Sequence, residues 1–130
     1  MSQEVASHIK LVKGFLLYKM YHLGYTDAAT PRHTSVDNLP KSCPPELREH
    51  VSDAVKELMK EQFLIPKPTS YGRHVFAVRN PSGYVYANTY AEYAGLPLLE
   101  YGIQPRAKVD PLPADELRRL ARMHRKKQNR

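Results

Sequence analysis

The last thirteen positions of this 130-residue chain carry a dense group of cationic side chains. A Lys or Arg placed beside a phosphate releases a condensed counterion, so such a group binds polyanions in a salt-dependent way. If all seven cations contacted one single strand, log K would fall against log salt with a slope of about −5. They are Arg118, Arg119, Arg122, Arg125, Lys126, Lys127 and Arg130. Phosphate binding is therefore the first chemistry that the residue types indicate.

The position of the charge makes this group stand out from the rest of the chain. The formal net charge is +7, and all thirteen acidic residues lie at or before Glu116. The other thirteen Lys and Arg residues balance them, so residues 1–117 are neutral and 118–130 hold the whole excess. Terminal blocks of like charge are typical of arms that bind nucleic acids.

A second group of candidate contacts surrounds an expected turn near residue 70. Lys67 and Arg73 can hold phosphates, and Tyr71 can stack on a base or a ribose. His74 lies in the next expected strand, and Arg79 directly follows that strand. The alternative is a tyrosine that packs across the turn beside ordinary exposed cations, and the sequence leaves both interpretations open.

The helix expected over residues 44–62 has a mixed outer face. If the chain reads DNA, this helix is the one expected to enter the major groove. Its cations are Arg48, His50, Lys56 and Lys60, and its acids are Glu46, Glu49, Asp53, Glu57 and Glu61. Five acids oppose groove binding, which favours a solvated helix in which Asp53–Lys56 or Glu57–Lys60 attraction offsets Glu57–Glu61 repulsion. Sequence-specific DNA reading is thereby disfavoured.

Neither enzymatic nor metal chemistry is indicated. The chain has no glycine-rich phosphate loop, Gly-x-Ser-x-Gly or His-Glu-x-x-His, and its six histidines have no paired spacing for a metal. We therefore expect no enzyme, no cofactor, no metal and no small-molecule substrate. Cys43 is the single cysteine, the N-terminus has no signal-peptide pattern, and the apolar run at 15–18 is too short to cross a bilayer. We expect a cytoplasmic protein that does not bind membranes.

Hydrophobic periodicity and turn residues predict the elements that position these groups. Helices are expected over 4–23, with Gly24 as its stop, then over about 35–39, 44–62 and 88–94, and from 115 onward. Strands are expected at 63–65, ended by Pro66 and Pro68, at 73–78, and at 84–86 after a turn at 80–83. Residues 98–113, with three prolines, are expected to be irregular.

Three helices followed by a hairpin form the winged-helix plan. The predicted fold class is α+β, a winged helix-turn-helix of three helices and a β-hairpin wing, with an irregular C-terminal extension and a basic helical tail. The predicted domains are a winged-helix domain at 1–95, a proline-rich extended segment at 96–113 and the basic helical tail at 114–130.

Two stretches also resemble a known group of proteins. Residues 33–41 (HTSVDNLPK) and 67–75 (KPTSYGRHV) are similar to small archaeal winged-helix proteins that are regarded as DNA-binding-like. The resemblance covers roughly residues 30–80 and is most specific at the KPTSYG turn. In helix order the chain is also similar to winged-helix proteins of the small ribosomal subunit. The resemblance implies a winged-helix fold and an archaeal source.

The sequence is compatible with three functions. The leading hypothesis is a ribosome-associated RNA-binding protein, structural or accessory, whose domain docks by shape and whose basic tail binds between RNA phosphates. Its partners would be ribosomal RNA, favoured over DNA, and ribosomal proteins. The runner-up is a DNA-binding transcriptional regulator or chromatin protein that uses the wing and the tail on the DNA backbone. The third is a protein–protein adaptor, because winged helices also bind proteins.

Overall fold

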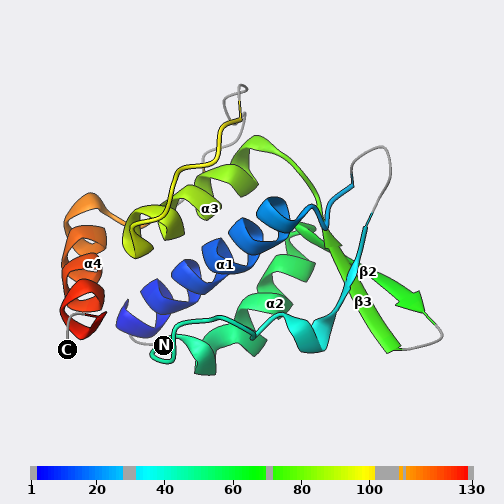
Figure 1. The fold of residues 1–130 in the computed structure, drawn as a ribbon, viewed down its shortest axis with the longest axis horizontal. Helices are drawn as coiled ribbons and strands as arrows, with labels where there is room; N and C mark the ends of the chain where they lie inside the picture. Colours follow the sequence, from blue (N-terminus) through cyan, green and yellow to red (C-terminus); the bar gives the residue numbers. More distant parts are fainter. Residues whose placement is uncertain (1–2, 28–31, 70–71, 102–108, 110, 129–130) are drawn as a thin grey trace.

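The protein is α+β, with a small antiparallel sheet at one end of a helical body (Figure 1). The computed structural model describes residues 3–27, 32–69, 72–101, 109 and 111–128. The helices are α1 (Gln3–Leu23), α2 (Val51–Lys60), α3 (Pro81–Ala94) and α4 (Ala114–Gln128), with 3₁₀ turns η1 (Val36–Asn38) and η2 (Arg48–His50). The strands are β1 (Thr34–Ser35), β2 (Leu64–Thr69) and β3 (Gly72–Ala77). No described helix is long and apolar enough to cross a bilayer.

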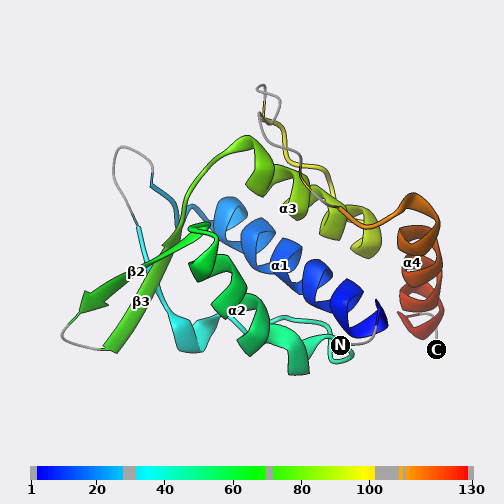
Figure 2. The ribbon, with the colours of Figure 1, turned by 180° about the vertical axis from the view of Figure 1, so that it is seen from behind.

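Helix α1 runs through the middle of the body, between α2 and α3 (Figures 1 and 2). The prediction of a helix over 4–23 is confirmed, and Gly24 follows it with a φ of +81°, the left-handed conformation that glycine adopts without strain. Leu11, Leu16 and Leu17 are completely buried although they point in different directions around the helix. The wide apolar arc of α1 thus provides the core against which the other helices pack.

The next two predicted helices form, but the first is a 3₁₀ turn and the second begins later than predicted. The short helix is confirmed as η1, capped by Ser35, whose side-chain oxygen accepts the backbone N–H of Asp37. The helix expected from residue 44 starts later, because backbone bonds of i→i+3 type continue from Pro44 to His50. Regular α-helical structure begins only at Val51 and ends at Lys60.

The sheet has the order β1-β3-β2, and both pairings are antiparallel. The prediction that Pro66 and Pro68 end the strand at 65 is wrong, because β2 continues through both to Thr69. Since β2 is an edge strand, a proline there removes no hydrogen bond from a central ladder. The hairpin of β2 and β3 follows α2 directly, an arrangement compatible with the winged-helix plan.

The predicted strand at 84–86 and helix at 88–94 are wrong as separate elements, because α3 covers both from Pro81 to Ala94. Asn80 caps this helix: its Oδ1 accepts the backbone N–H of Gly83 at 2.7 Å, and proline stands at the first helical position. The residues interpreted as a turn are therefore a helix start, and α3 packs along α1.

The predicted C-terminal helix is confirmed as α4, at the opposite end of the body from the hairpin (Figures 1 and 2). Residues 96–101 and 111–113, before α4, have no regular structure. Leu112, Leu120 and Ala121 belong to the same apolar core as the buried face of α1. Helix α4 is therefore packed onto the body through part of its surface.

Candidate nucleic-acid interface

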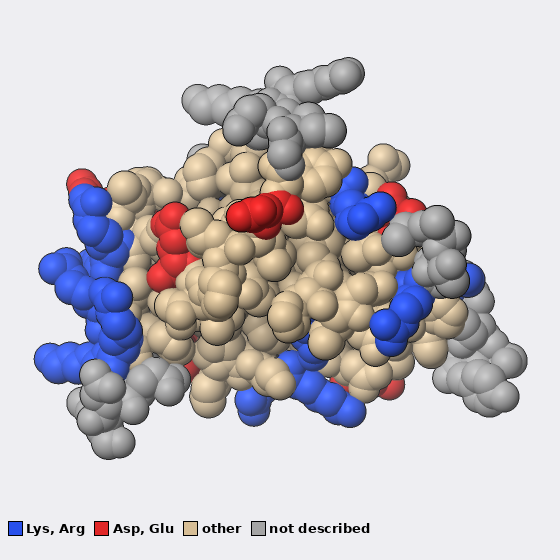
Figure 3. Space-filling model, turned by 45° about the horizontal axis from the view of Figure 1, so that its top comes forward, with Lys and Arg blue, Asp and Glu red and all other residues tan. Residues whose placement is uncertain are grey.

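Helix α4 presents its cations on one exposed face. At 100° per residue, Arg118, Arg119, Arg122, Arg125 and Lys126 fall within an arc of about 120°, and all five side chains are exposed. Figure 3 shows these cations as a blue band along the left edge of the molecule. The side chain of Lys127 and the whole of Arg130 lie outside the described residues. The predicted basic tail is thus a helix with one basic side.

The opposite side of α4 is held to the body by a hydrogen-bond network. His124, 8% exposed, donates from Nδ1 to Glu46 Oε1 at 2.9 Å, and the Tyr93 hydroxyl donates to the same oxygen at 2.9 Å. Burial alone would raise the pKa of Glu46, but these bonds from His124 and Tyr93 and a bond to its own backbone lower it overall. Glu46 is therefore a carboxylate that joins α4 to α3 and to the loop before η2.

Two of the five arginine and lysine side chains are already paired with acids. Arg118 pairs with Asp115, and Arg119 lies 3.6 Å from Glu116, which also accepts a hydrogen bond from Ser7. No described acid forms an ion pair with Arg122, Arg125 or Lys126. These three cations, which together span about one helical turn, carry positive charge that no described acid neutralises and that an external anion can meet.

The second predicted group of contacts lies on the hairpin, far from α4. Lys67 and Arg73 are exposed on β2 and β3, while Tyr71 lies outside the described residues. His74 Nδ1 lies 2.8 Å from Nδ1 of His33, and desolvation with the nearby Lys67 and His74 lowers the pKa of His33. His74 of the hairpin is therefore bound to His33, the residue before β1.

Arg79, just beyond β3, is also engaged within the protein. Its Nε lies 3.8 Å from Asp27 Oδ1, and its backbone N–H donates to the same oxygen at 3.0 Å. Because the hairpin and α4 occupy opposite ends of the long axis (Figure 1), the predicted site residues form two separate cationic surfaces. A ligand must be long enough to span the body if it contacts both.

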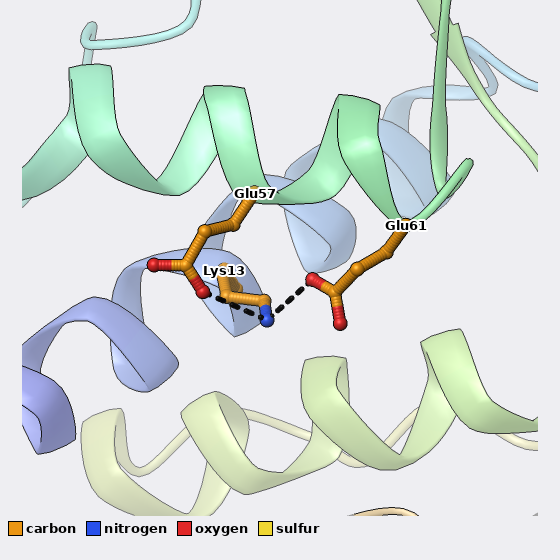
Figure 4. A network of polar contacts seen from close by, with 3 residues as sticks. All are labelled: Lys13, Glu57 and Glu61. Atoms are coloured by element: carbon orange, nitrogen blue, oxygen red, sulfur yellow. Dashed lines mark hydrogen bonds and ion pairs between the residues drawn. The ribbon is translucent and has the colours of Figure 1, made fainter.

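The acids of the segment 44–62 form ion pairs that differ from the predicted ones. Lys13 of α1 is 4% exposed and lies between two of them, 2.6 Å from Glu61 Oε1 and 3.4 Å from Glu57 Oε1 (Figure 4). This contact, rather than the predicted Asp53–Lys56 or Glu57–Lys60 pairs, relieves the repulsion between Glu57 and Glu61. The position of Lys13 between Leu11-Val12 and Phe15-Leu16, among apolar residues, was the signal for this contact in the sequence.

With Glu46 bound to His124 and the two glutamates bound to Lys13, three of the five acids are used inside the protein. Glu49 of η2 and Asp53 of α2 remain exposed, as do the cations Arg48, Lys56 and Lys60. The outer surface of α2 is therefore close to balanced in charge, and less acidic than its composition indicates.

The remaining candidate for chemistry is Cys43, which is buried, and burial raises the pKa of its thiol to about 11. The thiolate needed for nucleophilic attack or metal binding is therefore scarce near neutral pH. Within the part of the chain that the structure describes, no three His, Cys, Asp or Glu side chains are grouped closely enough to hold a metal ion. Comparison with protein-family models, curated proteins and solved structures finds no match for this chain.

Proposed function

We propose that this protein is a non-enzymatic, ribosome-associated RNA-binding protein of winged-helix type that contacts RNA phosphates through the exposed face of α4. The observation that carries the proposal is the row of uncompensated cations Arg122, Arg125 and Lys126 on a helix fixed to the body. The element order and the β1-β3-β2 sheet, with α2 directly before the hairpin, support the winged-helix assignment.

A fixed helix suits phosphate recognition better than a free arm. The buried His124 and the core residues Leu120 and Ala121 order α4 without any ligand. Binding then costs little conformational entropy for the backbone of α4, and the rise of 1.5 Å per residue places the cations from 118 to 126 along about 12 Å. RNA helices are recognised mainly by shape and by phosphate and 2′-hydroxyl contacts, which such a cationic edge provides.

RNA is favoured over DNA because the excess charge is not on α2. A DNA-reading winged helix places the helix before the wing in the major groove. Here that helix and the preceding turn η2 still expose Asp53 and Glu49, and no described Asn or Gln lies within Val51–Lys60 to read base edges. The strongest cationic surface lies instead on the C-terminal helix, at the far end from the hairpin.

The DNA alternative has one observation in its favour. Lys13 neutralises Glu57 and Glu61, which removes much of the acidity that disfavoured groove binding by α2. In this alternative, Arg48, Lys56 and Lys60 with Lys67 and Arg73 of the hairpin would contact the DNA backbone.

Crosslinking in cell extract, followed by identification of the bound polymer, tests the two functions together. We expect the full chain to recover ribosomal RNA, and the variant Arg122→Gln/Arg125→Gln/Lys126→Gln to lose it. The matched control Lys56→Gln/Lys60→Gln/Lys67→Gln removes the same charge elsewhere and should retain the RNA. Recovery of particular DNA sequences, lost in the control variant, would replace the RNA proposal by the DNA one.

A further inference from the structure

We infer that the cleft between α1, the loop at 42–45 and the C-terminal ends of α3 and α4 receives one unpaired nucleotide of the bound RNA, with its base against an aromatic ring and its phosphate between Lys19 and Arg125. This inference rests on the proposed function, because it supplies a second contact for an RNA strand held on α4. It adds a preference for unpaired nucleotides, which phosphate contacts alone do not give.

The cleft joins the basic face of α4 directly. Its volume is about 690 Å³, and Arg125 lines it while also belonging to the exposed cationic row. A strand that contacts Arg122 and Lys126 therefore passes the mouth of the cleft. The groove needs no rearrangement of α4 to be reached from the proposed binding surface.

The interior of the cleft is aromatic. Phe15 and Tyr90, each 5% exposed, form its floor and pack edge to face with ring centroids 5.4 Å apart. Tyr18, half-buried and 6.4 Å from Tyr90 between ring centroids, is the ring that an entering base can reach. Every nucleobase has a π-face, so such a ring stacks on bases with little regard to sequence. The Tyr18 hydroxyl donates to the backbone oxygen of Pro97 at 2.9 Å, which fixes the ring that is least buried of the three.

The mouth of the cleft carries positive charge without a compensating acid. Lys19 Nζ donates to the backbone oxygens of Asn38 and Lys41 at 2.7 and 2.8 Å, and an ammonium group has a third hydrogen to offer. No described carboxylate forms an ion pair with Lys19 or Arg125. Burial and the neighbouring Lys41 lower the pKa of Lys19, and an approaching phosphate would reverse that shift. The positive charge at the mouth matches the phosphate of a nucleotide, and the aromatic side chain inside matches its base.

The backbone at the rim is held in an uncommon conformation. Ser42 has a φ of +71°, in the left-handed region that residues with a side chain rarely adopt, and its exposed side chain lines the cleft. The Lys19 bond to the adjacent Lys41 oxygen fixes this loop. Such positions cluster at binding sites, where surrounding contacts hold them.

The test compares two RNA hairpins of equal length, one fully paired and one with a single bulged 2-aminopurine. We expect the full chain to bind the bulged RNA about 5- to 160-fold more tightly, which is the range for stacking one base on aromatic side chains. The fluorescence of the 2-aminopurine should fall on binding, because the base stacks on the Tyr18 ring. The variant with Ala94→Phe, which fills the cleft from the last turn of α3, should lose the preference and bind the paired RNA as before.

The second variant, Lys19→Gln, should lose part of the preference, with Lys60→Gln as the control that keeps it. Far-ultraviolet circular dichroism verifies that each variant is folded. Equal affinity of the full chain for the two hairpins, or a preference that Ala94→Phe leaves intact, overturns the nucleotide cleft while phosphate binding by α4 stands. A preference confined to bulged DNA overturns it as well. If neither hairpin binds at all, the proposed function itself fails and the cleft inference fails with it.

Discussion

Removal of the Lys13 ammonium group should destabilise the fold by an amount that the geometry bounds. The Lys13 side chain is 5% exposed, whereas the side chains of Glu57 and Glu61 are 45% and 38% exposed. Breaking a fully buried ion pair costs about 3–5 kcal/mol, because the remaining charge is left uncompensated. In Lys13→Met the two carboxylates left behind can be rehydrated, which lowers the expected loss to about 2 kcal/mol.

Thermal and urea unfolding measure this loss. For a chain of this size, about 2 kcal/mol corresponds to a decrease in Tm of roughly 8 °C. Adding Glu57→Gln and Glu61→Gln to Lys13→Met should restore part of the stability, since the two acids repel each other once the lysine is gone. The control Lys60→Gln, on the exposed end of α2, should change the free energy of unfolding by less than about 0.5 kcal/mol.

The sign of the pH dependence gives a second check on Lys13. Burial lowers its pKa, but the hydrogen bond with Glu61 and the charges of Tyr86, Glu61 and Glu57 raise it by more, so its pKa in the folded protein lies above 10.5. The stabilisation of the fold by the Lys13 ammonium group is therefore fully present below pH 10.5 and is lost as the pH rises through the folded pKa of Lys13. Lys13→Met that is as stable as the unmodified chain at neutral pH would refute this reasoning.

Two further predictions concern the packing of α3 and α4. Gly14→Ala should destabilise the protein by about 1–3 kcal/mol in urea unfolding, because the added Cβ would lie 2.2 Å from the backbone oxygen of Tyr86 on α3. An unchanged urea midpoint would contradict the close approach of α1 and α3. Because the folded pKa of Glu46 is lowered, its stabilisation is present above pH 4.5 and is lost as the pH falls through that folded pKa. The stability difference between the unmodified chain and Glu46→Gln should therefore shrink on acidification, and a constant difference from pH 7 to 3 would refute the role of Glu46.

The sequence predicts those elements whose signals are local. The helix over 4–23 with its glycine stop and the helix from 115 onward were predicted correctly, because hydrophobic periodicity, capping and the helix dipole, which favours Asp115 and Glu116 in the first turn of α4, act within a few residues. The segment 80–83 was misassigned for the same reason. Asn-Pro-Ser-Gly fits a turn and a capped helix start equally well, and only packing of α3 on α1 decides between them.

Arg118, Arg119, Arg122, Arg125 and Lys126 are exposed on α4, and Lys67 and Arg73 on β2 and β3, but their separation into two surfaces was not predictable. Which end of the body a helix occupies depends on long-range contacts such as His124 with Glu46, 78 positions apart in the chain. Lys13 with Glu57 is a second example, 44 positions apart. The aromatic cleft is likewise built from α1, a loop and two later helices, so no spacing in the sequence marks it.

The salt dependence of RNA binding tests the central claim most directly. Each phosphate contact with single-stranded RNA contributes about 0.7 to the slope of log K against log salt. Replacing Arg122, Arg125 and Lys126 by Gln should therefore make the slope shallower by about 2 and weaken binding at low salt, whereas the Lys56, Lys60 and Lys67 control should leave the slope unchanged. Equal slopes for the unmodified chain and the α4 variant would contradict the account, because the cations of α4 would then not contact the RNA.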